Sequence, residues 1–302
     1  MFARGKLPRD MGVATKIRNE LARRAPRLED KAQLAAWRLR NRDRGTQPVV
    51  PDRLAPVLET LKRDGVAITD AGTVFGDTAV YDAAAARADE LYRAPREESE
   101  AGAGSKGTFL TKLATGSYEF DDPFVRLAIH PDAMAVANGY LRLYANLRAL
   151  DLWLTKPTEG PAIQTQLWHR DGDDVMNVKM FVYFTDVRPA AGPLRYAPGT
   201  HPLGAHRRLP EQDEQARSDD PQMATVVPEH EWVLCEGGPG TVVFADTCGY
   251  HKQQKPETDE RLLLVAHYVS GSPYVPPALE LRNVDAAALD QAQHYAVFDR
   301  PR

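Results

Sequence analysis

The run Gln166-Leu-Trp-His-Arg-Asp-Gly-Asp173 sets His169 and Asp171 two positions apart, and His251 follows 82 residues after His169. In an extended strand alternate side chains share one face, so His169 and Asp171 reach a common point, whereas a helix sends them about 200° apart. A second imidazole from a distant strand completes a set of two histidines and one carboxylate. Such a set holds a mononuclear non-haem iron and leaves the opposite face of the metal open. The spacing therefore predicts a metal site carried by strands.

The chain around this run consists of short segments rich in β-branched and aromatic residues, separated by Pro and Gly. Such segments are typical of strands. Many strands with no long helix between them predict an antiparallel sandwich or barrel. The polar segment 203–220 is expected to be an exposed insertion near one barrel mouth. The expected strands cover residues 149–155, 163–169, 175–184, 194–196, 225–227, 232–234, 241–244 and 261–269.

Upstream of residue 147 the periodicity favours helices. We expect residues 1–50 to form a basic helical extension and residues 51–302 a single domain, whose all-β core covers about 147–270 with helices flanking it. The segment 97–106, with several Gly and Ser, is expected to be a mobile loop that acts as a lid. The expected helices are two short ones within 11–44, interrupted at Pro26, then 54–63, 80–92 and 131–144, with a short strand at 66–68.

The composition is that of an ordinary soluble protein, with 43% hydrophobic and 26% charged residues and a net charge of −4. This balance predicts no nucleic-acid partner. Residues 1–44 carry 13 Lys or Arg against 5 Asp or Glu. A basic helix of this kind can touch a membrane or nucleic acid, but a solvated helix docked on an acidic barrel is the simpler interpretation.

Two cysteines, Cys235 and Cys248, lie in different segments with no CxxC motif, which favours buried thiols over a disulfide or a structural zinc site. Free thiols are typical of a reducing cytoplasm. No apolar run approaches the roughly 20 residues of a membrane span, and residues 1–25 lack the apolar stretch of a secretory signal. We therefore expect a cytoplasmic protein without a membrane span.

Further motifs follow the metal run in a fixed order. They are Lys179-Met-Phe-Val-Tyr-Phe-Thr-Asp186, Gly192-Pro-Leu-Arg-Tyr-Ala-Pro-Gly-Thr-His201, Gly240-Thr-Val-Val-Phe-Ala-Asp246 and Arg261 at the start of the last strand. With these motifs, the chain resembles the phytanoyl-CoA dioxygenase-like family of Fe(II)- and 2-oxoglutarate-dependent oxygenases over about residues 60–270. The resemblance implies a double-stranded β-helix, also called a jelly-roll or cupin-like fold, with iron inside one mouth.

The resemblance also implies roles for individual residues. His169, Asp171 and His251 match the family's ligands of Fe(II), and Arg261 matches the arginine that binds the distal carboxylate of 2-oxoglutarate. The open positions on the metal then take 2-oxoglutarate and O2. A guanidinium offers a planar fork that fits a carboxylate, which lysine does not reproduce.

Three more residues are candidates for contacts around 2-oxoglutarate, each with a structural alternative. Gln166 precedes His169 by three residues, Lys112 lies in an early strand, and Thr258 is close to Arg261. Trp153 and Trp168 are expected to pack rather than to bind, and Asp173 and Asp174 to be solvated loop carboxylates unless they contact the substrate. The other histidines are expected to be structural, His201 as a turn residue of the family and His206, His230, His267 and His294 without motif support.

The carboxylate of Asp171 bears on the type of reaction. Related halogenases lack it, so its presence favours hydroxylation, with release of succinate and CO2, or desaturation, cyclisation or epimerisation. A zinc-dependent hydrolase or lyase uses a similar ligand set, but has no need for Arg261 opposite the metal. A non-catalytic binding barrel is the third interpretation. We expect a small-molecule substrate and a tailoring step of specialised metabolism, and the sequence does not define the oligomeric state.

Overall fold

The computed structural model describes residues 26–44, 49–95, 109–206 and 208–299. The lid expected at 97–106 and the first of the two N-terminal helices lie outside the described residues. The longer helices are α2 (Pro26–Arg40), α3 (Ala55–Asp64), α4 (Ala71–Phe75), α5 (Ala79–Arg93), α6 (Pro123–Ala128), α7 (Pro131–Leu141), α8 (Asp220–Ala224) and α9 (Gln291–Phe298). The strands are β1 (Val66–Asp70), β2 (Leu110–Thr115), β3 (Ser117–Glu119), β4 (Asn146–Thr155), β5 (Val178–Tyr183), β6 (Leu194–Tyr196), β7 (Val233–Cys235), β8 (Thr241–Ala245), β9 (His251–Gln253), β10 (Arg261–Val269) and β11 (Glu280–Arg282).

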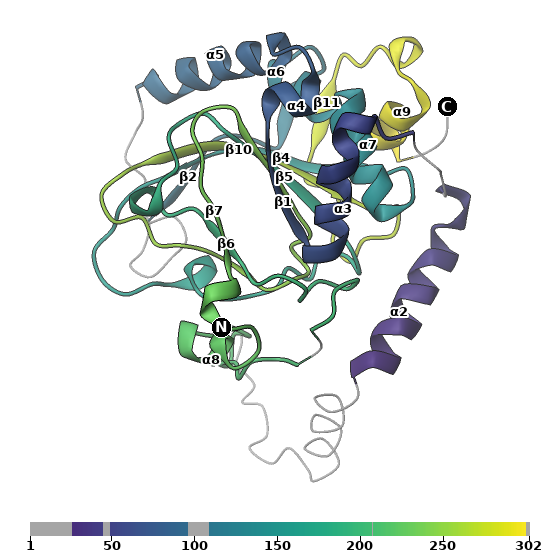
Figure 1. The fold of residues 1–302 in the computed structure, drawn as a ribbon. Helices are drawn as coiled ribbons and strands as arrows, with labels where there is room; N and C mark the ends of the chain where they lie inside the picture. The colour runs from purple at the N-terminus through teal and green to yellow at the C-terminus, as the bar shows by residue number, and fades with distance from the viewer. Residues whose placement is uncertain (1–25, 45–48, 96–108, 207, 300–302) are drawn as a thin grey trace, which may run out of the picture.

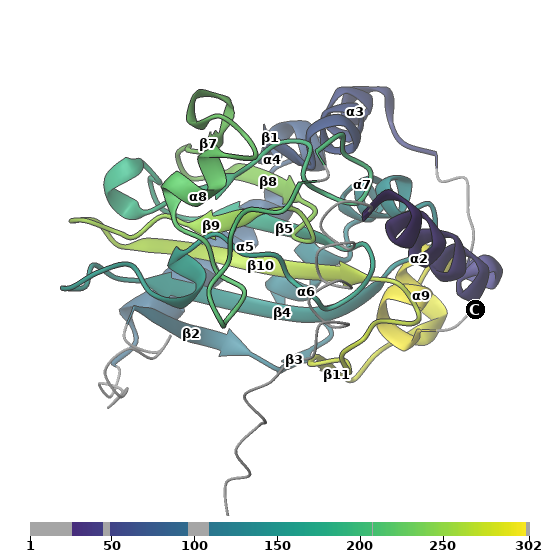
Figure 2. The same ribbon diagram turned by 90° about the horizontal axis from the view of Figure 1, so that it is seen from below.

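Two antiparallel sheets form the core. The large sheet has the order β1-β8-β5-β10-β4-β2, and the small sheet has the order β7-β6-β9. Figure 2 shows β2, β4, β10, β5 and β8 as successive neighbours across the large sheet. Side chains of the two sheets share one apolar cluster, which contains Phe181, Leu194, Tyr196 and Leu263. The expected double-stranded β-helix with flanking helices is confirmed.

Strand β10 shows how the sequence builds two layers at once. Every one of its residues is buried. Because alternate side chains of a strand point to opposite faces, Leu263 and Val265 enter the space between the sheets, while Leu262 and Leu264 enter the cluster under the helices. A strand covered on both faces reads as a continuous apolar run, which explains why 261–269 was predicted with its exact bounds.

Helices cover the outer face of the large sheet. The cluster under them joins residues of α3, α4, α5, α6 and α7 to β4, β5, β8 and β10. Figure 1 shows these helices along the upper and right-hand sides of the sheet, while β6 and β7 lie on the opposite side. Trp37 of α2 is buried in the same cluster. The division of the chain at residues 50 and 51 stays a prediction.

Two expectations about elements were wrong. Residues 163–169 do not form a continuous strand, because a 3-10 turn occupies Gln164–Gln166 and only Trp168 and His169 form isolated bridges. Residues 225–227 form turns after α8. Helix α2 begins at Pro26, where the break between the two N-terminal helices was expected, and a proline at the first helical position loses no hydrogen bond.

None of the helices in the described ranges is both long enough and apolar enough to cross a bilayer.

Candidate active site

Backbone pairing brings the two candidate histidines together. The amide of His169 donates to the carbonyl of His251, and the amide of His251 donates to the carbonyl of His169, each over 3.0 Å. Residues that exchange both hydrogen bonds lie directly opposite each other, so their side chains share a face. The His169 segment therefore continues the small sheet beyond β9. The amide of Asp171 is held in turn by the carbonyl of Thr247, at 2.8 Å.

The three side chains converge as the spacing predicts. His169 Nε2 lies 3.8 Å from Asp171 Oδ1, and His251 Nε2 lies 3.8 Å from Asp171 Oδ2. The two imidazole centroids are 4.3 Å apart. One ligand atom from each residue falls within 4.8 Å of the others. Among the described residues this is the one group of His, Cys, Asp or Glu side chains close enough to hold a metal ion.

The other ring nitrogens fix the tautomers of the two histidines. His169 Nδ1 lies 2.9 Å from the carbonyl oxygen of Leu167, and His251 Nδ1 lies 3.0 Å from that of Gly249. A carbonyl only accepts a hydrogen bond, so each Nδ1 carries the proton and donates it. Each Nε2 then keeps its lone pair and faces Asp171, the arrangement that metal-binding histidines adopt.

The protonation states also suit a cation. Burial lowers the pKa of both His169 and His251, the former to well below its usual value, so both imidazoles are neutral at pH 7. Burial opposes ionisation of Asp171, but Lys179 and the two histidines outweigh it and hold the pKa of this carboxyl well below its usual range. Two neutral imidazoles and one carboxylate are thus ready to bind a divalent metal.

Lys179 is a neighbour of this group that we did not predict. Its ammonium lies 2.6 Å from Asp171 Oδ2, and only 14% of its side chain is exposed. Lys179 belongs to β5, where Phe181 and Tyr183 follow it on the same face. The three side chains line the same pocket.

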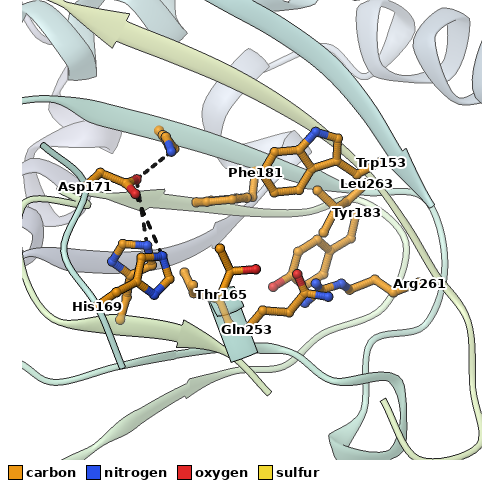
Figure 3. A pocket seen from close by; sticks show the side chains of 12 residues that line it. Trp153, Thr165, His169, Asp171, Phe181, Tyr183, Gln253, Arg261 and Leu263 are labelled. Carbon is orange, nitrogen blue, oxygen red and sulfur yellow. Dashed lines mark hydrogen bonds and ion pairs between the residues drawn. The ribbon is translucent and has the colours of Figure 1, made fainter. Parts of the chain in front are cut away.

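This pocket runs from the metal group to Arg261, as Figure 3 shows. His169 and Asp171 stand at one end, and Arg261, Gln253 and Tyr183 stand at the other. Apolar side chains form the walls between the two ends, namely Trp153, Phe181, Leu194 and Leu263. The pocket therefore forms a passage with apolar walls between the candidate metal group and a cation.

Arg261 is the cation at the far end, and it is 3% exposed. Its Nη1 donates to the carbonyl of Gly192, while its Nε is buried without a partner among the described residues. Burial lowers the pKa of Arg261 to about 10, which leaves it charged at pH 7. No carboxylate of the described residues forms an ion pair with it, yet a buried charge is stable only when paired. An anion bound at this end of the pocket would supply the counter-charge of Arg261.

Two uncharged side chains reinforce this requirement. Gln253 Nε2 and Thr165 Oγ1 line the same pocket, and both are buried without hydrogen-bond partners among the described residues. Unsatisfied buried polar atoms are uncommon in native proteins and usually await a ligand or water. In Figure 3 Gln253 lies beside Arg261 and Thr165 lies between Gln253 and His169, positions that fit a polar ligand such as a dicarboxylate.

The structure places the other three candidates outside this pocket. Gln166 is buried, and its Oε1 accepts a hydrogen bond from the Ile163 amide, so it holds the turn that carries Thr165. Lys112 is paired with Asp151 at 2.8 Å and lines a separate depression at the sheet edge. Thr258 is exposed, and its hydroxyl donates to Asp259.

These positions have simple physical reasons. The ammonium of Lys112 is occupied by the nearest carboxylate of β4, and Thr258 lies in a turn before β10 rather than in the barrel. We therefore assign neither residue to 2-oxoglutarate. Gln166 keeps an unpaired Nε2 but does not line the pocket.

Other expectations had mixed outcomes. Trp168 packs against Trp232 with ring centroids 4.8 Å apart, as expected, but Trp153 lines the pocket. Asp174 is not a solvated carboxylate, because it is 4% exposed and accepts hydrogen bonds from Trp37 Nε1 and the Ser270 amide.

The sequence holds a recognisable pattern for two of the three pocket residues that we did not predict. Gln253 follows His251 by two residues, so a strand at this point puts both on one face. Lys179 similarly alternates with Phe181 in a strand that was expected. Thr165 sits in a 3-10 turn, for which the sequence gives no periodic signal.

Comparison with known proteins is consistent with this geometry. The family model described as Phytanoyl-CoA dioxygenase (PhyH) matches residues 61–259. That range includes all three residues of the metal group. A comparison with curated protein sequences gives no match.

Solved structures share the fold. The epimerase SnoN, in complex with Fe3+, alpha ketoglutarate and nogalamycin RO, has a TM-score of 0.52 at 20% identity, with 80% of this chain and 93% of SnoN covered. The non-heme alpha ketoglutarate dependent carbocyclase SnoK from nogalamycin biosynthesis has a TM-score of 0.52 at 19% identity, with coverages of 81% and 94%. EctD from S. alaskensis, in its apoform, has a TM-score of 0.52 at 18% identity, with coverages of 79% and 91%.

At these identities the structural likeness concerns the fold alone, whereas the family model covers about two thirds of the sequence. The matched range includes the metal group and most of the residues that line the pocket, whereas Arg261 and Leu263 lie just beyond its end. The chain therefore belongs to the phytanoyl-CoA dioxygenase family.

Proposed function

We propose that the protein is an Fe(II)- and 2-oxoglutarate-dependent oxygenase that oxidises a small molecule at an unactivated C–H bond. One observation carries this proposal: a buried, unpaired Arg261 faces a His-Asp-His group along a single pocket. Neither feature alone distinguishes the reaction, but their combination fits a dicarboxylate that reaches from a metal to a guanidinium.

His169, Asp171 and His251 would hold the iron. Their donor set of two neutral imidazole nitrogens and a carboxylate oxygen suits ferrous iron. Arg261 would bind the distal carboxylate of 2-oxoglutarate, with Gln253 and Thr165 supplying the hydrogen-bonding groups that are now unsatisfied. When bound, Fe(II) together with 2-oxoglutarate and O2 supplies the oxidising power, and succinate and CO2 are the products.

The residues of the chain contribute position and a dry environment. The apolar walls, among them Phe181 and Leu263, exclude water around the reacting groups. Lys179 holds one oxygen of Asp171 in place. We infer hydroxylation as the outcome, because Asp171 fills the position that halogenases leave open. Desaturation, cyclisation and epimerisation need the same residues, and SnoK and SnoN are a carbocyclase and an epimerase.

A zinc-dependent hydrolase or lyase is the rival function. Zinc accepts two histidines and a carboxylate with an open fourth position. That chemistry needs no buried cation at the far end of the pocket. Arg261 therefore favours the oxygenase.

The direct test is the conversion of 2-oxoglutarate into succinate by the purified full-length chain with Fe(II) and O2. We expect succinate whose formation depends on iron. Replacement of Fe(II) by Zn2+ should abolish its formation. Absence of succinate across a broad panel of small molecules would contradict the proposal.

Asp171→Ala should abolish iron-dependent succinate formation, because it removes one of three ligands. Asp186→Ala is the matched control, since Asp186 pairs with Arg188 on the surface. Retained oxidation in Asp171→Ala would show that the reaction does not depend on the His-Asp-His group.

A further inference from the structure

A second cavity adjoins the metal group and has no role in the proposed function so far. It measures about 470 Å³, and Asp171 lines both this cavity and the pocket that ends at Arg261. Small-molecule sites commonly span about 300–1,000 Å³. A molecule that fills the second cavity therefore reaches the carboxylate that would hold the iron.

The charged side chains of this cavity favour an anion. Arg170 and Arg208 line it, and neither forms an ion pair within the part of the chain that the structure describes. The guanidinium of Arg170 lies over the Tyr250 ring, 5.2 Å from its centroid. The carboxylates on the cavity wall are already engaged, Asp171 by Lys179 and Asp174 by Trp37 and backbone amides. The cationic groups are thus available to a ligand.

The rim of the cavity is apolar. Leu209 and Tyr274 line it, and they are 39% and 58% exposed. Exposed large hydrophobic side chains grouped at a cavity mark a binding surface. The Tyr274 amide donates to the carbonyl of Asp173, at 2.8 Å, so this rim is tied to the loop that follows Asp171. A ligand with an apolar body would cover both side chains.

One wall comes from outside the region that matches the family. Gln33 of α2 lines the cavity, whereas the family match begins at residue 61. In Figure 1, α2 is the purple helix at the right-hand side. Trp37, one helical turn after Gln33 and 1% exposed, donates from Nε1 to Asp174 Oδ1 over 2.8 Å. This bond fixes α2 to the loop that carries Asp171.

We propose that the second cavity is the substrate pocket, that α2 forms one of its walls, and that its ligand is an amphipathic anion. The ligand class is a carboxylate or a phosphate on an apolar body, with the anion at Arg170 and Arg208 and the body against Leu209 and Tyr274. This inference rests on the proposed function, because it places the substrate beside the iron.

The test uses four probes with the full-length protein, loaded with Zn2+ and saturated with 2-oxoglutarate so that the Arg261 pocket is filled. 3-Phenylpropanoate and phenyl phosphate carry both features, 3-phenylpropanamide lacks the charge, and propanoate lacks the ring. Isothermal titration calorimetry should show that at least one of the two ring-bearing anions binds about 10-fold more tightly than both the amide and propanoate. The stronger of the two identifies carboxylate or phosphate as the preferred anion.

Variants locate the binding. Arg170→Gln and Arg208→Gln should each weaken binding of the ring-bearing anion by about 5- to 10-fold. Neither substitution should change the affinity for 3-phenylpropanamide. Arg40→Gln is the control, because it removes the same charge from the exposed end of α2. It should change neither the affinity for the anion nor the affinity for the amide. Gln33→Ala and Trp37→Phe should alter the affinity of the ring-bearing anion by about 3-fold or more, since the first removes a wall contact and the second releases α2 from Asp174.

The outcomes separate this inference from the proposed function. Equal binding of the anions and the amide, or binding that saturating 2-oxoglutarate abolishes, would overturn the substrate pocket while succinate formation stands. Unchanged probe affinity in Gln33→Ala and Trp37→Phe would overturn the role of α2. Failure of the proposed function appears instead as an absence of succinate, which these titrations do not measure.

Discussion

Arg261 carries a buried charge whose natural counter-charge is absent from the described side chains. Desolvation of such a group is costly, and a bound carboxylate offsets that cost. The residue thus explains why a pocket with apolar walls would select a dicarboxylate over a neutral ligand. Its contact with Gly192 also orients the guanidinium from the backbone.

Arg261→Gln should weaken 2-oxoglutarate binding by about 30-fold or more, because the distal carboxylate loses a charge-assisted partner of about 2 kcal/mol or more. The affinity for Zn2+ should stay unchanged, since the metal group lies at the other end of the pocket. Calorimetric titration of both ligands measures the difference. Arg188→Gln is the control. Normal 2-oxoglutarate affinity in Arg261→Gln would contradict the assignment of Arg261 as the anion-binding residue.

Lys179 acts on the metal through Asp171 rather than directly. Lys179→Met should weaken Zn2+ binding by about 10- to 100-fold, the usual effect of removing a partner of a metal ligand. It should also shift the pH midpoint of metal binding upward, because the pKa of Asp171 rises without the ammonium. Lys179→Arg should restore most of the affinity. Tighter metal binding in Lys179→Met would show instead that the lysine competes with the ion.

Individual residues differed in how far the sequence could predict them. His169, Asp171 and His251 were found because their types and spacing match one ligand geometry. Lys112 was misplaced because its position in a strand does not reveal that Asp151 takes its ammonium. Contacts of this kind depend on neighbours far away in sequence.

Among the elements, the turn Pro189–Ala191 and the following Gly192 place the carbonyl that accepts from Arg261. Gly192 has φ +68, and a Cβ there would lie 2.2 Å from the carbonyl oxygen of Gln254. The turn can therefore not accommodate a side chain without moving. The close packing of Gly192 against Gln254 therefore fixes the carbonyl that holds Arg261.

Gly192→Ala should lower the free energy of unfolding by about 1–3 kcal/mol, because it adds a positive-φ side chain and a backbone clash. It should also weaken 2-oxoglutarate binding, since the Gly192 carbonyl moves away from Arg261. Urea unfolding and calorimetry measure the two effects. Gly238→Ala, which meets no atom within 4 Å, is the control. Equal stability of the two variants would contradict the packing argument.

The elements that the sequence predicted well are those with strong local signals. Strand β10 is apolar throughout, and α5 follows the expected helix 80–92 to within one residue at each end. Strand β9 was missed because His-Lys-Gln carries no apolar alternation. The run Thr225-Val-Val227 has β-branched residues, but α8 with its Asp219 cap precedes it and the chain turns there.

For the whole molecule, buried histidines link stability to pH. Burial lowers the pKa of four histidines, so these side chains stay neutral when their unfolded counterparts take up protons below about pH 6.5. They are His130, His169, His251 and His267. The unfolded state then binds more protons, and stability falls as the pH falls. Asp246 acts in the opposite direction, because burial raises its pKa to about 7 and the folded state keeps its proton.

The four histidines outnumber the three carboxyls whose pKa burial raises, Asp122, Asp174 and Asp246. We therefore expect a net loss of stability for the metal-free protein between pH 6.5 and 5, at about 1.4 kcal/mol per pH unit for each group that differs. Urea midpoints at several pH values, with a chelator present, measure this slope. His267→Gln should make it shallower without removing a metal ligand. A midpoint that rises on acidification would contradict the assignment of neutral histidines.

The backbone pair between His169 and His251 joins two segments that lie 82 residues apart in the chain. An ion held by both imidazoles would act as a reversible cross-link that closes this long loop. Because the ion would bind the closed, folded loop and not the open chain, part of its binding free energy would appear as stability of the fold. Iron in this protein would serve the architecture of the barrel mouth as well as its chemistry.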